Sequence, residues 1–531
     1  MTDQINAPEP GEEPGGDAYI AMRRRHLAEL RAVGVEPFTY RYDPTHRVSE
    51  LAAGWEELCR PQDAEEEQPV VRIAGRLMAV RSHGKTTFAD LLDATGRIQV
   101  YLRKADLGEE TFRVFELLDL GDWVGVEGTL MVTRMGERTV KARALQVLAK
   151  AMRPIPTPKT VVDEESGEER TFHAFADKEL RYRRRYVDLF TNPETREVFR
   201  VRARLVTELR RLLDGRGFLE VETPVLQALH GGASARPFIT HHNALDVDLY
   251  LRIALELYHK RLIVGGLERV YEIGRIFRNE GIDRRHNPEF TMLELYQAYA
   301  DYGDIMDLVE DIFRHWCRTV LAGRSRVVFD GVEIDLAPPY PRRPFLELLK
   351  EHSGLDGQTL NEGELLDALA RAGAETSAKI GRGALLDEAF GHFVEPRLIQ
   401  PVFVTDYPVE LSPLAKRHRS EPGLTERFEL YVAGMEFANA FSELNDPDDQ
   451  RGRFLAQLQL LELGDEEAQR LDEDFLLALE YGMPPTGGLG IGIDRVTMLV
   501  TDQRSIRDVI LFPTLRPGPS TGGPDTGDSG H

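Results

Sequence analysis

The sequence predicts an α+β protein in which a small β-barrel is followed by a larger domain built on an antiparallel β-sheet with flanking helices. Three observations predict this class. Residues 70–148 fall into short, β-branched, alternating segments, two later segments have the pattern of long hairpins, and the stretches around them have helical periodicity. At 531 residues the chain exceeds what one hydrophobic core usually organises, so we expect several structural units.

The composition is typical of a folded protein from a reducing compartment, for which we expect the cytoplasm. Hydrophobic residues make up 42% and charged residues 29%, which is ordinary globular usage. Cys59 and Cys317 stand far apart and form neither a disulfide framework nor a zinc motif. No secretory signal and no run of about 18 apolar residues occurs, so we expect no membrane association. The net charge of −23 would ordinarily argue against a nucleic-acid partner, but nucleic acid is held by local patches and an acidic protein can still carry a basic groove.

The two ends of the chain are expected to be disordered tails. Residues 1–17 and 517–531 are rich in proline, glycine and small or acidic residues. Residues 18–68 follow as an N-terminal helical extension, which includes a helix over 19–33. The three consecutive arginines that start at Arg23 form a small basic face, which fits either an ordinary solvated surface or an RNA contact.

Residues 69–150 are expected to form an OB-fold barrel. The segment reads as three strands, a helix near 109–118 and two more strands, with glycines at the turns or bends, which is the order of that fold. OB barrels bind oligonucleotides across one face by stacking and by hydrogen bonds to base edges. The alternative is that the candidates on this face are ordinary strand-face or loop residues. These candidates are Phe88, Gln99 and Glu137.

A proline-rich linker over 151–180 separates the barrel from a second domain over 181–516, which contains a helical insertion at about 300–395. The second domain begins with a helix over 202–214, and the segment FLEVETPVL after it has a strand pattern halted by Pro224. One side of the helix carries Leu205, Leu209 and Leu212, and we expect this apolar side to lie uncovered on a single subunit and to pack in a homodimer interface.

Residues 269–299 alternate with period two on either side of a polar loop, which predicts a long antiparallel hairpin. Arg278 and Glu280 are expected to share one face of the first strand. If the faces of the two strands coincide, a guanidinium, aromatic rings and carboxylates line one sheet surface. The matching face of the second strand carries Phe290, Glu294 and Tyr296, and the polar loop carries Arg284, Arg285, His286 and Asn287, whose cationic side chains suit phosphate contacts.

A second hairpin is predicted over 427–446, with its turn near Ala433 and Gly434. Glu429 and Glu436 then lie roughly opposite each other, which is a natural site for a hard cation such as Mg²⁺. Asn439, Phe441 and Glu443 share one face of the returning strand. Further on, GGLGIGIDR predicts a glycine-rich strand that leads into a helix, with Arg495 at the junction.

Together these motifs resemble the class II aminoacyl-tRNA synthetases. The helix and strand that end in VETPV, the stretch from FRNEG to RHNPEFTMLE, and GLGIGIDR are similar to motifs 1, 2 and 3 of that class. With the preceding OB-fold they match the subclass of the aspartate, asparagine and lysine enzymes. The nearest likeness is to the bacterial lysyl-tRNA synthetases, through GGASARPF, FSELND and IRDVILFP, and it covers about residues 19–516.

The resemblance implies ATP-dependent ligation of L-lysine to tRNA(Lys) through a lysyl-adenylate, with release of AMP and pyrophosphate, by a homodimer that uses Mg²⁺. It implies catalytic roles for Arg278 and Arg495 and an ATP site at Arg278, Glu280, Arg285, His286, Asn287, Phe290 and Arg495. It implies a lysine site at Gly232, Glu256, Arg278, Glu294, Tyr296, Asn439, Phe441 and Glu443, and a metal site at Glu429 and Glu436. It also implies that Phe88, Gln99 and Glu137 contact the anticodon.

The chain departs from the family pattern at a few backbone positions. Leu255 stands where the family commonly has proline, and His230 stands at another such position. Ala438 and Ala440 replace glycines on either side of Asn439. Every charged position of the pattern is kept.

Three other functions compete with this interpretation. An aspartate- or asparagine-specific synthetase of the same subclass has the same motifs, but an aspartate pocket needs cations, whereas Glu256, Glu294 and Glu443 are anions. A ligase that attaches lysine to a protein resembles the catalytic domain but lacks the OB-fold. A non-catalytic nucleic-acid binder is opposed by the complete second and third motifs.

Overall fold

The computed structural model describes residues 17–60, 68–83, 86–156, 159–162, 169–172, 175–374, 381–464 and 468–516. The tails expected at both ends therefore lie outside these residues, except for Asp17, which already belongs to the first helix. The chain divides into two compact units, Met1–Asp177 and Lys178–His531. Among the helices of the described ranges, none is long and apolar enough to cross a membrane.

The first unit contains the expected barrel, closed in the strand order β1-β2-β3-β5-β4. Its strands alternate between buried apolar and more exposed positions, so one side of each strand fills the interior. A Cβ at Gly128 would lie 2.1 Å from the carbonyl oxygen of Lys141, so the close approach of two strands at a bulge requires glycine there. The strands are β1 Val70–His83, β2 Thr86–Leu92, β3 Arg97–Arg103, β4 Trp123–Val132 and β5 Arg138–Ala149.

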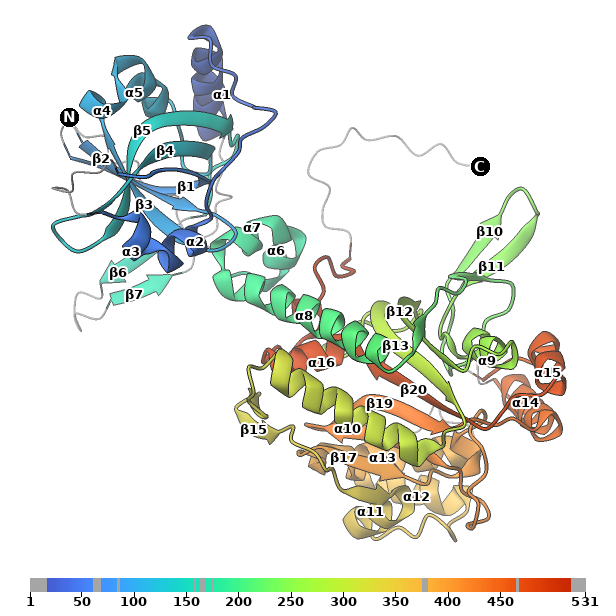
Figure 1. The fold of residues 1–531 in the computed structure, drawn as a ribbon. Helices are drawn as coiled ribbons and strands as arrows, with labels where there is room; N and C mark the ends of the chain where they lie inside the picture. The colour runs from blue at the N-terminus through green and yellow to red at the C-terminus, as the bar shows by residue number, and fades with distance from the viewer. Residues whose placement is uncertain are drawn as a thin grey trace. The chain divides into compact units, whose positions relative to one another are not determined.

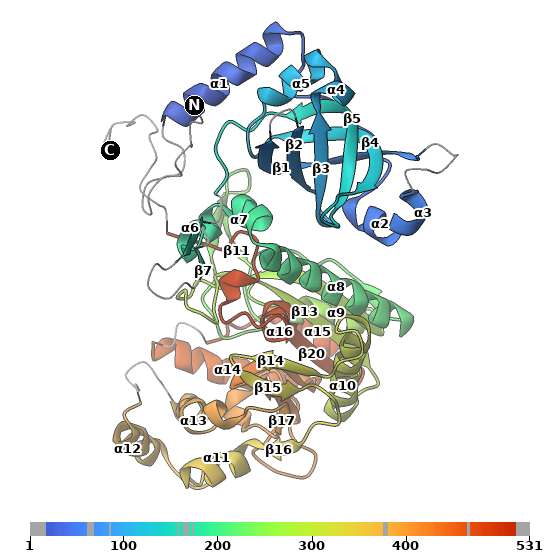
Figure 2. The same cartoon turned by 90° about the vertical axis from the view of Figure 1, so that its left-hand side faces the viewer.

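Short helices cover the two ends of the barrel (Figure 2). They are α2 Val48–Ala53 and α3 Trp55–Leu58 at one end, and α4 Lys104–Leu107 and α5 Glu109–Glu116 at the other. The N-terminal helix is α1 Asp17–Ala32. The last strands of this unit in the sequence form a small hairpin of β6 Lys159–Val162 and β7 Glu169–Phe172. Arg23 of α1 is buried and donates to the carbonyl oxygens of Ala151 and Leu120. This arginine therefore has a structural role, while Arg24 and Arg25 are exposed.

The second unit is built on an eight-stranded sheet in the order β16-β17-β18-β19-β20-β13-β12-β8 (Figure 1). Neighbours pair antiparallel, except that β16 with β17 and β12 with β8 are parallel. The strands are β8 Leu219–Glu220, β12 Arg269–Phe277, β13 Glu289–Ala298, β16 Arg342–Pro344, β17 Val402–Thr405, β18 Arg427–Val432, β19 Met435–Ser442 and β20 Thr486–Gly492.

One face of this sheet packs on three helices and forms the main core. Figure 1 shows α8 Pro193–Gly215 and α10 Tyr302–Thr319 side by side along the sheet, and α16 Ile493–Val500 continues directly from β20. Leu293 and Leu295 of β13 and Ile491 of β20 point into this core. Since side chains alternate along a strand, the residues between them face the other side of the sheet, where the functional site lies.

The helix α8 covers its own apolar face within the chain. Leu205, Leu209 and Leu213 are fully buried and Leu212 is only partly buried, so the buried row follows the spacing of four rather than the one expected from sequence. The expectation that the leucine side of this helix lies uncovered on a single subunit is therefore wrong, so this side gives no argument for a homodimer. The strand expected for FLEVETPVL is also reduced to the two-residue strands β8 and β9 Leu226–Gln227.

The region expected as a helical insertion at 300–395 divides into two parts. The helix α10 packs in the main core, together with the hairpin β14 Arg326–Phe329 and β15 Val332–Asp335. The later helices form a separate apolar cluster around the stacked rings of Phe345 and Phe390. This later part is made of α11 Phe345–Ser353, α12 Glu362–Ala372 and α13 Gly381–Phe393.

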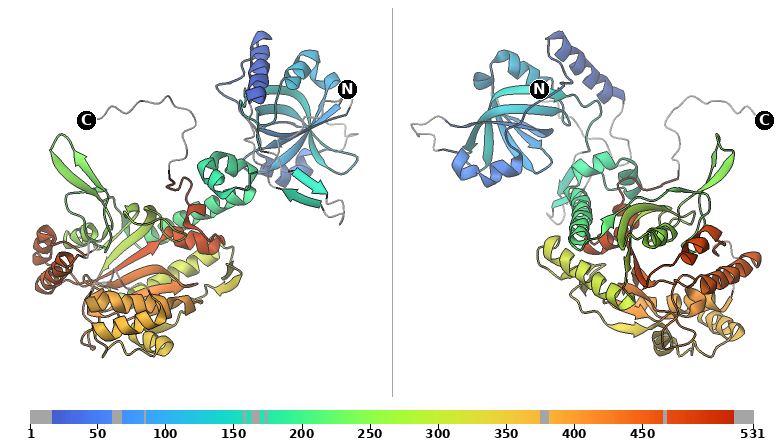
Figure 3. Two further views of the ribbon diagram at one scale, coloured as in Figure 1. Left: turned by 180° about the vertical axis from the view of Figure 1, so that it is seen from behind. Right: turned by 45° about the vertical axis from the view of Figure 1, so that its right-hand side comes forward.

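Within the described ranges, the remaining elements of the second unit are a hairpin, five helices and short 3₁₀ turns. A hairpin of β10 Ile239–His242 and β11 Val247–Leu251 projects from the rest of the second unit (Figure 3, green). The other helices are α6 Lys178–Arg183, α7 Arg185–Thr191, α9 Glu256–Val264, α14 Pro447–Glu462 and α15 Glu473–Glu480, with short 3₁₀ turns at Glu395–Arg397, Val409–Leu411 and Ile506–Asp508.

Candidate active site

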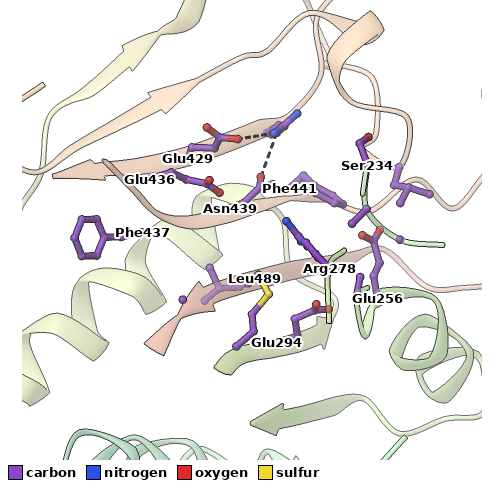
Figure 4. A pocket seen from close by; sticks show the side chains of 18 of the residues that line it. Ser234, Glu256, Arg278, Glu294, Glu429, Glu436, Phe437, Asn439, Phe441 and Leu489 are labelled. Atoms are coloured by element: carbon purple, nitrogen blue, oxygen red, sulfur yellow. Dashed lines mark hydrogen bonds and ion pairs between the residues drawn. The ribbon is translucent and has the colours of Figure 1, made fainter. Parts of the chain in front are cut away.

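A cavity of about 510 Å³ lies on the open face of the sheet of the second unit. Its floor comes from β13, β18, β19 and β20, and one wall comes from the start of α9 (Figure 4). Every candidate for the ATP, lysine and metal sites lines this one cavity. These residues are Gly232, Glu256, Arg278, Glu280, Arg285, His286, Asn287, Phe290, Glu294, Tyr296, Glu429, Glu436, Asn439, Phe441, Glu443 and Arg495.

The first hairpin places a guanidinium over an aromatic ring. The guanidinium carbon of Arg278 lies 5.3 Å from the ring centroid of Phe290, and its Nε donates to the carbonyl oxygen of Ile253 at 3.4 Å. Arg278 and Glu280 lie beyond the end of β12 at Phe277, not on the strand as expected, although the backbone N–H of Arg278 still donates to Pro288. The second strand keeps the expected parity, because Phe290, Glu294 and Tyr296 all face the cavity.

The loop between β12 and β13 is held by its own aspartate. Asp283 accepts hydrogen bonds from the backbone N–H groups of Arg285 and His286 and interacts with His286 Nδ1 at 2.8 Å. Arg285 donates to the carbonyl oxygen of Gly434 at 3.2 Å, and Arg495 donates to the carbonyl oxygen of Glu436 at 2.6 Å. The guanidiniums at this end are therefore anchored to backbone, with nitrogens left to contact an anionic ligand.

The opposite end of the cavity contains three buried carboxylates. Glu256, Glu294 and Glu443 are each less than a tenth exposed. Glu294 accepts hydrogen bonds from the N–H of Leu255 at 3.1 Å and from the hydroxyl of Tyr296 at 3.2 Å. Burial and the charge of Glu256 nevertheless raise the pKa of Glu294 to about 7. Such a concentration of buried negative charge is costly unless a cation neutralises it.

Gly232 and Gly488 supply the space that these carboxylates need. Gly232 has φ +87, and a Cβ there would meet Glu256 Cβ at 3.3 Å. A Cβ at Gly488 would lie 1.8 Å from Glu443 Oε1 and 2.7 Å from Tyr296 Cε1. Glycine is therefore required at both positions, by conformation at the first and by close packing at the second.

The second hairpin has a different register from the expected one. Its turn lies at Ala433 and Gly434, both with positive φ, as the sequence predicts. A bulge between Leu430 and Tyr431 places Glu429 opposite Asn439 and Tyr431 opposite Glu436. The two glutamates are therefore not directly opposite each other, because the turn already pairs Glu436 with Tyr431, and the bulge moves the partner of Glu429 to Asn439. Both still face the same cavity (Figure 4).

Glu429 is held by three neighbours. Its Oε1 accepts from Arg427 at 2.5 Å, and its Oε2 accepts from the hydroxyls of Tyr407 at 2.9 Å and Tyr431 at 2.8 Å. Arg427 also donates to Asn439 Oδ1 at 3.1 Å, so one guanidinium orients the two facing residues of β18 and β19. Sequence reasoning did not find Arg427. The available signal was that Arg427 lies two residues before Glu429, and therefore on the same face of the strand.

Two further acidic groups lie near Glu429 in the cavity wall. Burial of the Glu436 carboxyl raises its pKa, and the negative charge of Glu429 is the second cause of the increase. Burial also raises the pKa of Glu395 to about 7, and the hydroxyl of Tyr431 bonds to this carboxylate at 3.0 Å. Within the described ranges, no three His, Cys, Asp or Glu side chains are arranged to hold a metal ion by themselves. A cation here would take some of its ligands from another molecule, which is how Mg²⁺ usually binds beside phosphates.

A buried lysine was also missed by sequence reasoning. Lys260 is fully buried and lies one helical turn after Glu256, with its Nζ 2.5 Å from Glu256 Oε1. The same ammonium is ion-paired with Glu443. The spacing of four residues in α9 was visible in the sequence, but it is also typical of solvent-exposed helix pairs. The burial that distinguishes this pair follows only from the tertiary structure.

On the barrel, Phe88, Gln99 and Glu137 lie on one outer face. Gln99 Nε2 donates to Glu137 Oε2 at 2.7 Å, and the ring of Phe88 lies 5.2 Å from that of Tyr101. Register places Phe88 opposite Tyr101 and Asp90 opposite Gln99, so all four side chains share this face. Arg81 and Arg97 both pair with Asp90 and add cationic groups that sequence reasoning did not select.

The chain is similar to one enzyme family over both units. Residues 177–516 match the family of class II tRNA synthetases (D, K and N), and residues 71–148 match an OB-fold nucleic acid binding domain. Three relatives, each named lysine–tRNA ligase, are about half identical to it. The relative from Pelotomaculum thermopropionicum is 52% identical, covering 97% of this chain and 98% of its own length; that from Moorella thermoacetica is 52% identical, covering 94% and 98%; and that from Synechococcus is 53% identical, covering 93% and 96%.

Proposed function

The chain belongs to the class II tRNA synthetases, and from this premise we propose that it joins L-lysine to tRNA(Lys) in an ATP-dependent reaction. The observation that carries the proposal is the end of the cavity formed by Glu256, Glu294 and Glu443. Three buried carboxylates fit a substrate with two ammonium groups, whereas an aspartate substrate would place a fourth anion among them. The aspartate and asparagine alternative is therefore not favoured.

The two chemical steps need positioned charges more than a protein nucleophile. In the first, a carboxylate oxygen of lysine attacks the α-phosphorus of ATP, and the bond to the bridging oxygen breaks, so that lysyl-adenylate forms and pyrophosphate leaves. In the second, a hydroxyl of the terminal tRNA adenosine attacks the lysyl carbonyl carbon and AMP leaves. Arg278 and Arg495, which both line the cavity, supply positive charge where phosphate charge is redistributed.

We assign the ATP site to the side of the cavity that carries the guanidiniums. Phe290 gives a flat surface for the adenine ring, and Glu280 gives a carboxylate for its amino group. The triphosphate would contact Arg285, His286 and Arg495. Asn287 donates to the carbonyl oxygen of Glu289 at 2.6 Å, so it shapes the end of the loop that carries the first two of these residues.

For Mg²⁺ we propose Glu429 and Glu436. The residues fit this ion, because two carboxylates face one cavity and the pKa of Glu436 is raised by burial and by its acidic neighbour. Bound there, the ion would neutralise charge on the phosphates. Glu429 would contribute through an oxygen already oriented by Tyr407 and Tyr431.

We assign anticodon recognition to the barrel face that carries Phe88, Gln99 and Glu137. A half-buried ring, a linked amide and carboxylate, and nearby arginines are the groups that bind single-stranded bases by stacking and edge contacts.

As domain assignment we propose an extension at 18–68, the anticodon-binding barrel at 69–150, a linker at 151–180 and the catalytic domain at 181–516. We propose the cytoplasm as the location, since Cys59 and Cys317 are both free thiols.

We also propose a homodimer, on a different surface from the α8 face. Six large apolar side chains in the chain segment from β8 to β11, which the structure describes throughout, are exposed in the single chain. Such a concentration on the surface marks an interaction site, and closed two-fold dimers are the commonest assemblies. The side chains are Leu219, Val225, Leu226, Ile239, Leu245 and Val247.

Charging of purified tRNA tests the proposed function. The protein, ATP and Mg²⁺ are incubated with labelled lysine and tRNA(Lys), and in parallel with labelled aspartate or asparagine and their own tRNAs. We expect acid-precipitable label only with lysine and tRNA(Lys). Charging with aspartate or asparagine would support the rival synthetases, and lysine transferred to protein but not to tRNA would support the protein ligase.

A further inference from the structure

Lys260 has a complete set of acceptors inside the protein. Its Nζ donates to Glu256 Oε1 at 2.5 Å, is ion-paired with Glu443 Oε2, and lies 3.5 Å from the carbonyl oxygen of Leu414. The rings of Phe441 and Phe475 lie 5.5 and 5.9 Å from it. Burial acts to lower the pKa of Lys260, but the two carboxylates outweigh it and the net shift is upward. The ammonium is therefore a fixed positive charge beneath the cavity.

This ammonium uses only one oxygen of each carboxylate. In the described part of the chain, Oε1 of Glu443 has no hydrogen-bond partner, although the residue is only 1% exposed. It lies against Gly488, whose lack of a side chain leaves room beside it. The bond from Lys260 to Glu256 goes to Oε1 of that carboxylate, and Glu256 lines the same cavity. Lys260 thus orients both carboxylates from behind and leaves one oxygen of each for a ligand.

The charges of this end of the cavity then match one kind of substrate. Three carboxylates, those of Glu256, Glu294 and Glu443, face a single internal cation, so two negative charges are unbalanced when all three are ionised. A free diamino acid brings two ammonium groups, and its carboxylate is left for Arg278. Without Lys260 three negative charges would remain, and buried carboxylates in excess take up protons instead of binding ligand.

We infer that Lys260 is a positioning residue that fixes the amino-acid end of the cavity to accept two ammonium groups, by holding one oxygen of Glu256 and one of Glu443. The inference rests on the proposed function. It assigns selectivity to the internal cation as well as to the carboxylates, because the cation sets both their orientation and the number of charges that the substrate must supply. An ordinary structural ion pair would affect stability without this effect on substrate choice.

The first test uses Lys260→Met, which is close in length but uncharged. Lysine-dependent exchange of pyrophosphate into ATP is measured first for the wild-type protein, then for the variant. We expect the KM for lysine to rise at least tenfold, with kcat at saturating lysine and the KM for ATP within about threefold of wild type. The matched control is Lys350→Met, since Lys350 is exposed on α11 and pairs with Asp356 outside the cavity. A lysine KM within twofold of wild type in folded Lys260→Met would overturn the inference.

The second test removes the cation together with one carboxylate. Glu443→Gln alone leaves one unbalanced negative charge for two substrate ammonium groups, whereas Glu443→Gln with Lys260→Met leaves two. We therefore expect the double variant to have a lysine KM at least threefold lower than that of Glu443→Gln, so that loss of the lysine partly rescues loss of the glutamate. The double variant also keeps fewer unpaired buried charges, so it remains informative where Lys260→Met does not fold.

A lysine KM in the double variant equal to or above that of Glu443→Gln would contradict the inference, because a purely structural Lys260 predicts additive losses. If the wild-type protein shows lysine-dependent pyrophosphate exchange but the variants do not behave as expected, only the role of Lys260 is contradicted. Wild-type protein with no lysine-dependent exchange contradicts the proposed function and this inference together.

Discussion

Single residues in this protein owe their chemistry to charge neighbours that are distant in sequence. Glu443 is the clearest case, because its carboxylate is buried, its Oε2 pairs with Lys260 and its Oε1 faces the cavity. Alternation along the strand predicts that Glu443 shares a face with Asn439 and Phe441, and the structure confirms this. The sequence could not show that Lys260 is buried against it, since burial depends on the packing of α9 on the sheet.

Replacement of Glu443 by glutamine tests its assignment to the lysine side chain. We expect Glu443→Gln to raise the lysine KM by roughly two orders of magnitude or more, because a desolvated ammonium loses its anion. The dependence of exchange on ATP and Mg²⁺ should change little. An unchanged lysine KM with an increased Mg²⁺ requirement would instead make Glu443 a metal ligand.

The raised pKa of Glu294 predicts that lysine binding depends on pH near neutrality. Burial and the charge of Glu256 raise the pKa of Glu294 to about 7, so the carboxylate is largely protonated at pH 6 and largely ionised at pH 8. A substrate ammonium favours the ionised form, so binding strengthens as the pH rises through 7. We expect the lysine KM to fall roughly tenfold from pH 6 to pH 8 and to level off above, as one titrating group requires.

The control for this pH dependence is Glu294→Gln, which keeps the hydrogen-bonding shape but cannot titrate. Its lysine KM should be higher and nearly flat over the same range. If the wild-type lysine KM is already flat between pH 6 and 8, Glu294 does not control binding in this way.

Among the elements, β20 shows how a glycine-rich strand serves the site. Gly488 faces Glu443 and Tyr296, while a Cβ at Gly490 would meet the flexible end of Met292 at 2.6 Å. We expect Gly488→Ala to raise the lysine KM at least tenfold and Gly490→Ala to change it less than threefold, because a methionine end can move aside and the Glu443 carboxylate cannot. Equal effects of the two variants on the lysine KM would show that the glycines serve the strand and not the pocket.

The barrel face is tested by Phe88→Ala. Stacking of a base on an aromatic ring is worth about 1 to 3 kcal/mol, so charging of tRNA should fall by roughly one to two orders of magnitude. Pyrophosphate exchange, which needs no tRNA, should remain near the wild-type rate. Equal loss in both assays would assign Phe88, whose ring packs on Tyr101, a structural role only.

The type of an element, helix or strand, was predictable from the sequence where a single hydrophobic periodicity dominates the segment. The five barrel strands and the two hairpins follow from alternation, and the closed strand order confirms the barrel. The bulge after Leu430 was not predictable, because one extra residue in a strand leaves the alternating pattern readable on both sides while it changes which residues pair. The place of α10 in the main core was also not predictable, since its apolar face is equally consistent with packing inside an insertion.

At the scale of the whole molecule, the two surfaces to which we assign binding lie in different units, the cavity in the second unit and the outer face of the barrel in the first. The formal charge of −23 describes neither of them, because guanidiniums line one end of the cavity and Arg81 and Arg97 lie on the barrel face. Local charge, and not net charge, therefore decides which anionic molecules the protein binds.

Assembly is the prediction that belongs to this scale. We expect the protein to sediment as a dimer at micromolar concentration, because the apolar surface between β8 and β11 would otherwise face water. Leu226→Glu, which places a charge on a side chain 46% exposed in the single chain, should shift the protein to monomer. Wild-type protein that sediments as a fully active monomer would contradict the proposal.

The central claim is that the buried carboxylates select lysine, and amino-acid-dependent exchange of pyrophosphate into ATP tests it most directly. The purified protein is assayed with each standard amino acid in turn, with ATP and Mg²⁺ held constant. We predict exchange with lysine at a kcat/KM at least a thousandfold above that for any other amino acid, since an uncharged side chain leaves Oε1 of Glu443 without a hydrogen-bond partner. Efficient exchange with aspartate or asparagine, and none with lysine, would contradict the account.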